Sequence, residues 1–128
     1  MMNEPRNTEK LIKEIIAKKV SELDLDNFSK NFPNSLLNKK AKLFLFQLIK
    51  SIRSRSALEI GTYLAGTTKI ISEALGKDGF ILTIEANKNR NEFIKKEIST
   101  WEKEFQKNTM PVISTSNDFF NITKFNEK

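Results

Sequence analysis

One stretch of this chain restricts its fold more than any other. The short apolar run Ser56–Ile60 ends abruptly at Gly61, and a helical pattern follows over residues 67–75. A second apolar run, Phe80–Glu85, comes after a turn that contains two glycines. Strands that alternate with helices in this way predict parallel strands joined by right-handed crossovers. We therefore expect an α/β fold with a Rossmann-like parallel sheet.

Helical periodicity predicts three further helices, over residues 7–23, 36–52 and 90–105. Residues 23–33 have the composition of a polar connection, and Asn89 with Glu92 matches a capping box for the third helix. We expect Leu37 and Phe93 to face the core. A third strand is expected at residues 111–114, whereas residues 118–128 carry little pattern. The expected fold is thus a truncated sheet of about three strands, preceded by two N-terminal helices.

The second apolar run contains too few polar residues for a strand with one solvated face. Phe80, Ile81, Leu82 and Ile84 fill most of its positions. A near-continuous apolar run is typical of a parallel strand with both faces covered. We expect this strand to be buried on both sides.

Charge separates two parts of what we expect to be one structural unit: an N-terminal helical segment, residues 1–55, and a partial Rossmann-like domain, residues 56–128. Residues 1–55 hold 12 Lys and Arg against 6 Asp and Glu, which accounts for the whole net charge of +6. Such an excess is one signature of nucleic-acid binding. However, 18 of the 22 basic residues are Lys, and they are spread over solvated helix faces. Nucleic-acid binding is therefore the weakest of the functional hypotheses.

The composition excludes several kinds of chemistry. The 128 residues include no Cys and no His, which rules out disulfides, thiolate metal sites and catalysis by an imidazole. The longest apolar run, residues 43–46, is too short to span a bilayer, and the N-terminus lacks the pattern of a secretory signal. We expect a cytoplasmic protein whose chemistry depends on carboxylates, Lys, Tyr, hydroxyls, backbone dipoles or a cofactor.

The residues at the ends of the first two strands are typical of a ligand site. Gly61 lets the chain turn tightly and lets a ligand approach the backbone. The helix that follows offers free amide groups to an anionic group. Glu85 ends the second strand, 24 positions after Gly61, and suits a bidentate grip on ribose hydroxyls. The pattern predicts a nucleoside-bearing cofactor across the carboxyl ends of these strands.

A dinucleotide is the less suitable cofactor. The fingerprint for it requires three closely spaced glycines, whereas the next glycine after Gly61 is Gly66. Glu59 also places a carboxylate at the mouth of the site. A carboxylate suits a cationic ligand better than a pyrophosphate.

The segment LEIGTY at residues 58–63, followed by Thr67 and by Ile84-Glu85, resembles the S-adenosylmethionine (SAM) site of class I methyltransferases. The most similar group contains the catechol and caffeoyl-CoA O-methyltransferases. The resemblance covers about residues 43–120 and includes Ser116-Asn117-Asp118 after the third strand. It implies the SAM-binding portion of an O-methyltransferase, which transfers a methyl group to a small-molecule acceptor.

The resemblance also implies roles for individual residues. Glu59 would lie near the methionine part of the cofactor, where Tyr63 and Thr67 would contact the amino-acid end. Glu85 would hold the ribose. The complete set of implied cofactor-binding residues is Glu59, Gly61, Thr62, Tyr63, Gly66, Thr67, Glu85, Ala86, Ser116 and Asn117.

Two positions depart from the family pattern. Ala65 stands where the family usually has glycine, and Asn87-Lys88 replaces an acidic residue followed by proline. The chain also supplies three recognisable strands where the family has seven, and it lacks the family's aspartate-rich metal motif. We therefore assign no catalytic base and no metal site. The alternatives are a degenerate methyltransferase-like module, whose sheet is completed by a homodimer or a partner chain, and a basic nucleic-acid-binding protein.

Overall fold

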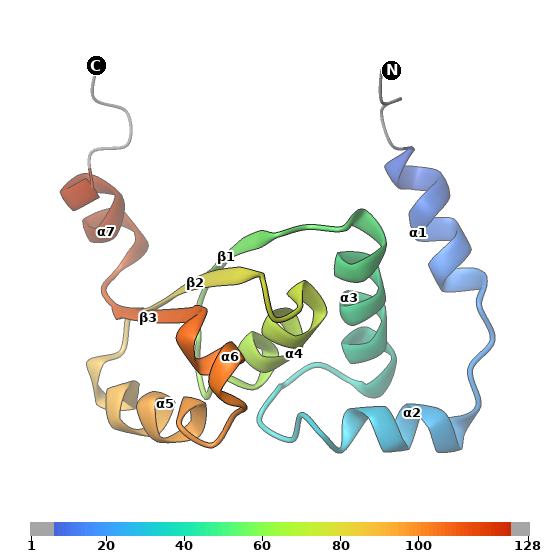
Figure 1. The fold of residues 1–128 in the computed structure, drawn as a ribbon, viewed down its shortest axis with the longest axis horizontal. Coiled ribbons are helices and arrows are strands. Elements are labelled where there is room, and N and C mark those ends of the chain that lie inside the picture. Colours follow the sequence, from blue (N-terminus) through green and yellow to red (C-terminus); the bar gives the residue numbers. More distant parts are fainter. Residues whose placement is uncertain (1–6, 124–128) are drawn as a thin grey trace.

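The computed structural model describes residues 7–123 (Figure 1). Three parallel strands form one sheet in the order β1 (Ser56–Ile60), β2 (Phe80–Glu85) and β3 (Thr109–Ile113). In the register of the sheet, Ile60 is opposite Ile84, and Glu85 is opposite Ile113. The parallel pairing confirms the predicted α/β class and the Rossmann-like sheet.

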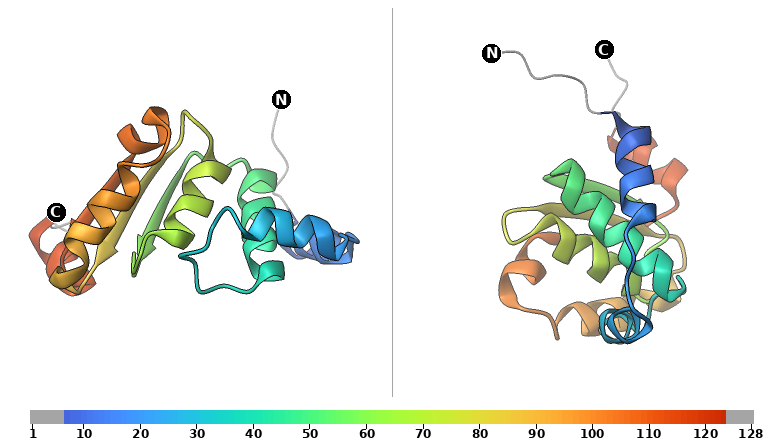
Figure 2. Two further views of the ribbon diagram at one scale, coloured as in Figure 1. Left: turned by 90° about the horizontal axis from the view of Figure 1, so that it is seen from below. Right: turned by 90° about the vertical axis from the view of Figure 1, so that its right-hand side faces the viewer.

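Helices cover one face of this sheet, and the N-terminal helices continue beyond it on the side of α4. The helices are α1 (Thr8–Ala17), α2 (Glu22–Ser29), α3 (Lys39–Ile52), α4 (Gly66–Leu75), α5 (Asn91–Ile98), α6 (Lys103–Lys107) and α7 (Ser116–Thr123), with a short 3-10 helix, η1 (Lys88–Arg90), before α5. α4 contacts β1 and β2, whereas α5 and α6 contact β3. α3 packs against α4 and in turn contacts α1 and α2, so the N-terminal helices extend away from the sheet (Figures 1 and 2).

The prediction for the N-terminal helices was only partly correct. A separate helix, α2, stands where we expected a polar connection, because Ser21 starts it: the Ser21 side chain accepts a hydrogen bond from the Asp24 amide. α3 starts three residues later than expected, because Asn38 caps it by accepting from the Ala41 amide at 2.8 Å. Leu37 therefore precedes the helix and is exposed, not in the core.

The expected helix over residues 90–105 is broken into two. The predicted capping box is wrong: Asn87 supplies the cap instead, and its side chain accepts from the Asn89 amide at 3.0 Å to form the 3-10 turn. α5 then ends at Ile98, and the chain turns so that Trp101 packs into the core. Within α5, Ile94 and Ile98 are the buried residues, whereas Phe93 is exposed, contrary to our expectation. Beyond α6, β3 begins at Thr109, two residues before the predicted start, and α7 occupies residues for which little structure was expected.

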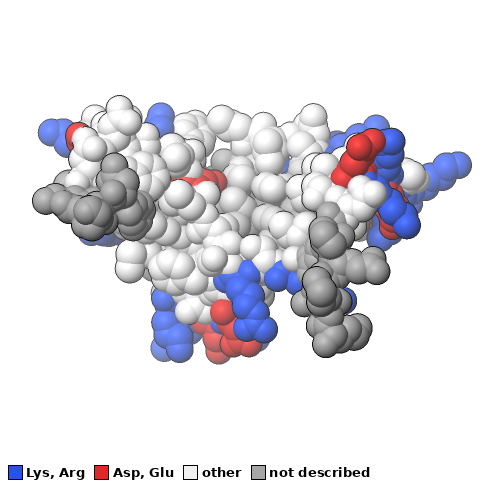
Figure 3. All heavy atoms as spheres, turned by 90° about the horizontal axis from the view of Figure 1, so that it is seen from above, with Lys and Arg blue, Asp and Glu red and all other residues white. Residues whose placement is uncertain are grey.

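The two faces of the sheet differ in cover. The face toward α4 is buried, with Ile81 and Thr83 of β2 at 1% and 0% exposure. On the opposite side, which we call the open face, four large side chains are 41–61% exposed: Leu58, Ile60, Phe80 and Met110. The expectation that β2 is buried on both sides is therefore wrong at Phe80. Seen from above, the centre of the molecule is mainly uncharged, and Lys and Arg lie around its margins (Figure 3).

No helix in residues 7–123 is long and apolar enough to cross a membrane.

Candidate functional site

The carboxyl ends of the strands meet at one edge of the sheet, and the loops that leave them stay connected there. The amides of Gly61 and Thr62 both donate to the Ile84 carbonyl, at 2.7 and 3.3 Å. The Ser114 amide donates to the Glu85 carbonyl at 2.9 Å. These bonds hold the loops after β1 and β3 against the end of β2. We call this edge the strand-end site.

The loop after β1 has the strained backbone of a ligand-facing turn. Gly61 has φ +95°, and a Cβ built there would find no other atom within 4 Å, so its outer side is open to an approaching molecule. Tyr63 and Ala65 also have positive φ, 53° and 65°. Glycine would adopt this conformation freely at position 65, whereas alanine costs about 1–2 kcal/mol. The departure at Ala65 is thus a source of backbone strain.

Gly66 allows the N-terminal segment to touch the first turn of α4. A Cβ at Gly66 would lie only 2.0 Å from the Ser35 nitrogen, so no larger residue fits. Next to it, the Thr67 and Ser35 hydroxyls are 2.7 Å apart. The predicted ligand residue Thr67 is therefore already bonded to Ser35. The sequence analysis missed Ser35, because nothing local indicates that it meets a helix 32 positions away.

Glu59 lies within a buried cluster of hydroxyl groups. Its Oε1 accepts hydrogen bonds from Thr68 Oγ1 at 2.5 Å and from Thr83 Oγ1 at 2.7 Å. Since the Thr83 proton is used in this way, the Thr62 hydroxyl 2.6 Å away must donate to Thr83. Burial raises the pKa of the Glu59 carboxyl, an effect that the two hydroxyl donors oppose and the nearby Glu85 reinforces. Thr62 thus faces the interior of the protein. Thr68 and Thr83 also belong to this hydroxyl cluster, and neither was predicted from the sequence.

Glu85 is almost fully buried at the end of β2, with 4% of its surface exposed. Its Oε1 accepts from the Tyr63 amide at 2.6 Å and its Oε2 from the Asn87 amide at 2.9 Å. Arg90 Nη1 also lies 3.1 Å from Oε2, and the Arg90 guanidinium carbon lies 4.6 Å from the centroid of the Tyr63 ring. The sequence analysis missed Arg90. The carboxylate predicted to hold a ribose therefore lies at the end of β2 and already accepts three hydrogen bonds.

The remaining predicted residues border this group. Ala86 is exposed directly after Glu85. Ser116 and Asn117 begin α7 beyond the end of β3, where the Thr115 hydroxyl caps the helix by accepting from the Asp118 amide at 3.0 Å. The structure thus gathers the predicted residues of β1, its loop and β2 around one carboxylate pair, with Ser116 and Asn117 at the neighbouring strand end.

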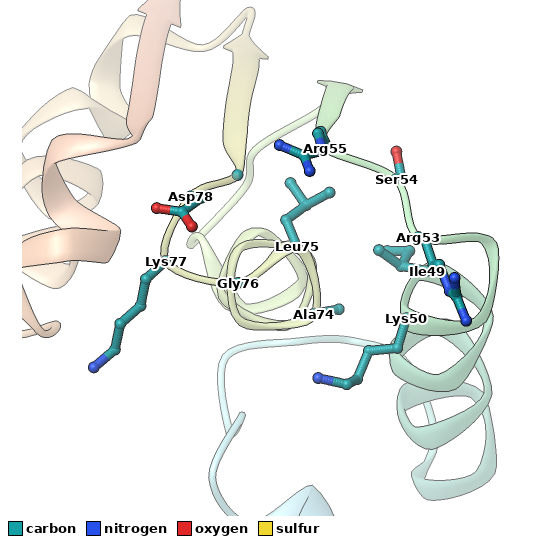
Figure 4. Close-up of a pocket in the computed structure, with 11 residues that line it drawn as sticks. Ile49, Lys50, Arg53, Ser54, Arg55, Ala74, Leu75, Gly76, Lys77 and Asp78 are labelled. Carbon is teal, nitrogen blue, oxygen red and sulfur yellow. The ribbon is translucent and has the colours of Figure 1, made fainter.

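A cavity of about 300 Å³ lies at the opposite end of the sheet (Figure 4). It is bordered by the ends of α3 and α4 and by the residues before β1 and β2, and its cationic side chains are Lys50, Arg53, Arg55 and Lys77. Carbonyl groups at helix C-termini favour nearby cations, which accounts for this cluster. Ligands of open α/β sheets bind at the other edge, so we assign no ligand to this cavity. Within residues 7–123, no group of three or more acidic side chains is arranged to hold a metal ion.

Comparison with known proteins identifies what the chain is similar to. The model of the O-methyltransferase family matches residues 10–125. Three solved structures share the fold, at 17–21% sequence identity. An O-methyltransferase from Bacillus cereus, in complex with SAH, is 21% identical with a TM-score of 0.63, over 93% of this chain and 54% of that one. The O-methyltransferase TomG from Streptomyces achromogenes, in complex with SAM, is 17% identical with a TM-score of 0.61, over 97% and 59%.

The third structure, from Staphylococcus aureus and assigned as a caffeoyl-CoA O-methyltransferase, is 19% identical with a TM-score of 0.61, over 93% and 56%. A comparison with curated proteins found no match. The chain therefore spans somewhat more than half the length of the solved structures that it resembles.

Proposed function

The chain belongs to the O-methyltransferase family, and on this premise we propose that its strand-end site binds SAM. The chain would then be the cofactor-binding portion of an enzyme that transfers a methyl group to an oxygen of a small-molecule acceptor. SAM would supply the reactive methyl on its sulfonium. The chain's own residues would bind and orient that group, since alignment of the reacting atoms is the main source of such catalysis.

The placement of Glu85 carries this proposal. Its carboxylate is at the end of β2 and is fixed by the amides of Tyr63 and Asn87, one from each adjoining loop. A carboxylate held by backbone amides at a strand end suits the two hydroxyls of a ribose. Gly61 supports the same interpretation, because its open outer side leaves room for a ligand to reach the backbone. The resemblance assigns Ser116 and Asn117 to the adenine, and we retain this as part of the proposal.

The loop after β1 would receive the methionine end of the cofactor. The positive α-amino and sulfonium groups of the methionine end suit the carboxylate of Glu59, which lies on β1 two residues before Gly61. Tyr63, Gly66 and Thr67 lead from there into α4, whose first amides suit the carboxylate of the methionine. The exposed Ala86 would border the ribose.

Calorimetric titration with SAH tests the proposal. We expect binding by the wild type and its loss in Glu85→Gln, which keeps the size of the side chain and removes its charge. Glu92→Gln is the matched control, since Glu92 is an exposed glutamate of α5, and it should bind as the wild type does. Absence of heat at millimolar SAH for the wild type, or equal binding by Glu85→Gln, would contradict the proposal.

The open face supports a second proposal, that another polypeptide completes the sheet. Parallel sheets are normally covered on both faces, and β1 is an edge strand whose outer side is unpaired within the described residues. A second copy of the chain or a separate partner would pair with this edge or cover the apolar side chains. Light scattering tests the homodimer: Ile60→Lys should shift a dimer toward monomer, whereas a wild type that is monomeric at all concentrations would exclude it.

A further inference from the structure

We propose that Arg90 is an internal competitor of a ribose for the Glu85 carboxylate. The Arg90 guanidinium must leave this carboxylate before a ribose can bind. This inference rests on the proposed function and deepens it, because it identifies what a nucleoside displaces. It also assigns a role to a residue that neither the motif nor the family resemblance indicated.

Glu85 can accept only a limited number of hydrogen bonds. An ionised carboxylate offers about four lone-pair positions. Three are taken, by the Tyr63 amide on Oε1 and by the Asn87 amide and Arg90 Nη1 on Oε2. One position remains, whereas two ribose hydroxyls need two. Binding a ribose at both hydroxyls therefore requires one of the present donors to leave.

Arg90 is the donor that is able to leave. The other two donors are main-chain amides in loops that are fixed by hydrogen bonds at the strand ends. The Arg90 side chain is 36% exposed, whereas that of Glu85 is 5% exposed. The guanidinium is thus at the solvent side of the pair and can rotate outward, while the carboxylate stays in place.

Arg90 covers a second part of the same site. Its guanidinium carbon lies 4.6 Å from the centroid of the Tyr63 ring, within the range of a cation–π contact. One side chain therefore bridges two of the residues assigned to the cofactor. A ligand that contacts both Glu85 and Tyr63 has to displace this bridge.

The local sequence explains why Arg90 reaches back to the strand. The Asn87 side chain accepts from the Asn89 amide, and the Arg90 amide donates to the Asn87 carbonyl at 3.0 Å. These bonds close a tight 3-10 turn directly after β2. The turn brings the fifth residue after Glu85 back over its carboxylate.

The test compares nucleoside binding by the wild type and by Arg90→Ala. Calorimetry with adenosine and with SAH should give an affinity about tenfold higher for Arg90→Ala, because the ligand no longer displaces a charge-assisted hydrogen bond. With 2′,3′-dideoxyadenosine, which lacks both ribose hydroxyls, the two proteins should bind alike. Arg55→Ala, at the opposite end of the sheet, is the matched control. Arg90→Gln serves as a second variant if Arg90→Ala melts early in circular dichroism.

Each outcome has a definite meaning. Equal or weaker adenosine binding by the Arg90 variants, alongside measurable binding by the wild type, would overturn the competitor role and leave the proposed function intact. An equal gain for dideoxyadenosine would also overturn it, because the ribose hydroxyls would then be irrelevant. Adenosine binding by Arg90→Ala but not by the wild type would support the competitor role. Absence of binding by every protein at millimolar ligand would overturn both.

Discussion

The two faces of the sheet differ in the residues they carry and in how far those residues are buried. The face toward α4 combines buried isoleucines with a chain of hydroxyls that ends on Glu59, and all of these groups are satisfied. The open face carries four large apolar side chains that remain largely in contact with solvent, Leu58, Ile60, Phe80 and Met110, whereas Ile84 on the same face is buried. The residues assigned to the cofactor belong to the covered face and to the strand ends. The candidate site is therefore supported by helices on one face of the sheet only, and another polypeptide that bound the chain would cover the open face.

The largest expected difference between the faces is in the cost of removing an apolar side chain. Ile81→Ala, at 1% exposure on the covered face, should lower the free energy of unfolding by about 2–5 kcal/mol. Leu58→Ala, at 49% exposure on the open face, should lower it by less than about 1 kcal/mol. Urea denaturation measures both. Equal losses would break the comparison and indicate that the open face is covered in solution.

A smaller effect is expected from the hydroxyl network. Thr83→Val keeps the shape of the side chain but leaves Thr62 without its acceptor and Glu59 without one of its donors. The loss should be about 1–3 kcal/mol, because the groups left unpaired are buried. Thr100→Val removes an exposed hydroxyl that donates to the Glu97 carbonyl and should cost under about 0.5 kcal/mol. Thermal unfolding of the two variants would sharpen the comparison, and similar losses would contradict the buried network.

The smallest effect concerns the charge of Glu59. Burial raises its pKa above the ordinary 4.5, so the folded chain retains a proton that the unfolded chain has released. This group's contribution to stability is then lost as pH rises from 4.5 through the folded pKa. Glu59→Gln should remove that dependence, so that its stability relative to the wild type increases from pH 4.5 to pH 8. Melting temperatures of both proteins across this range check the sign. A melting temperature of Glu59→Gln that falls relative to that of the wild type as pH rises would contradict the prediction.

The sequence was sufficient where structure is determined by neighbouring residues. The bounds of β1 and β2 were predicted correctly, because each is an apolar run limited by turn residues. The N-terminal helices were misplaced because single capping side chains, Ser21 and Asn38, determined where α2 and α3 start. One hydrogen bond at a cap outweighed a hydrophobic pattern that would have fitted a longer helix.

The candidate site was predicted at its strand ends and missed at its long-range contacts. Glu59 and Glu85 lie in the last two positions of their strands and Gly61 directly follows β1, so topology alone brings them to one edge. Ser35, Thr83 and Arg90 join them through contacts that depend on how loops and helices pack. The individual cofactor roles, the division at residue 55 and a cytoplasmic location remain predictions.

The contact at Gly66 also has a consequence for how the chain folds. Two backbone segments about thirty residues apart must meet without any side chain between them. Closing a loop of this length costs chain entropy, so we expect this contact to form after the local turns of the helices. The first turn of α4 would thus be completed only after the N-terminal helices have docked. Removing residues 1–55 takes away Ser35 and the whole of α3, so the first turn of α4 should fray.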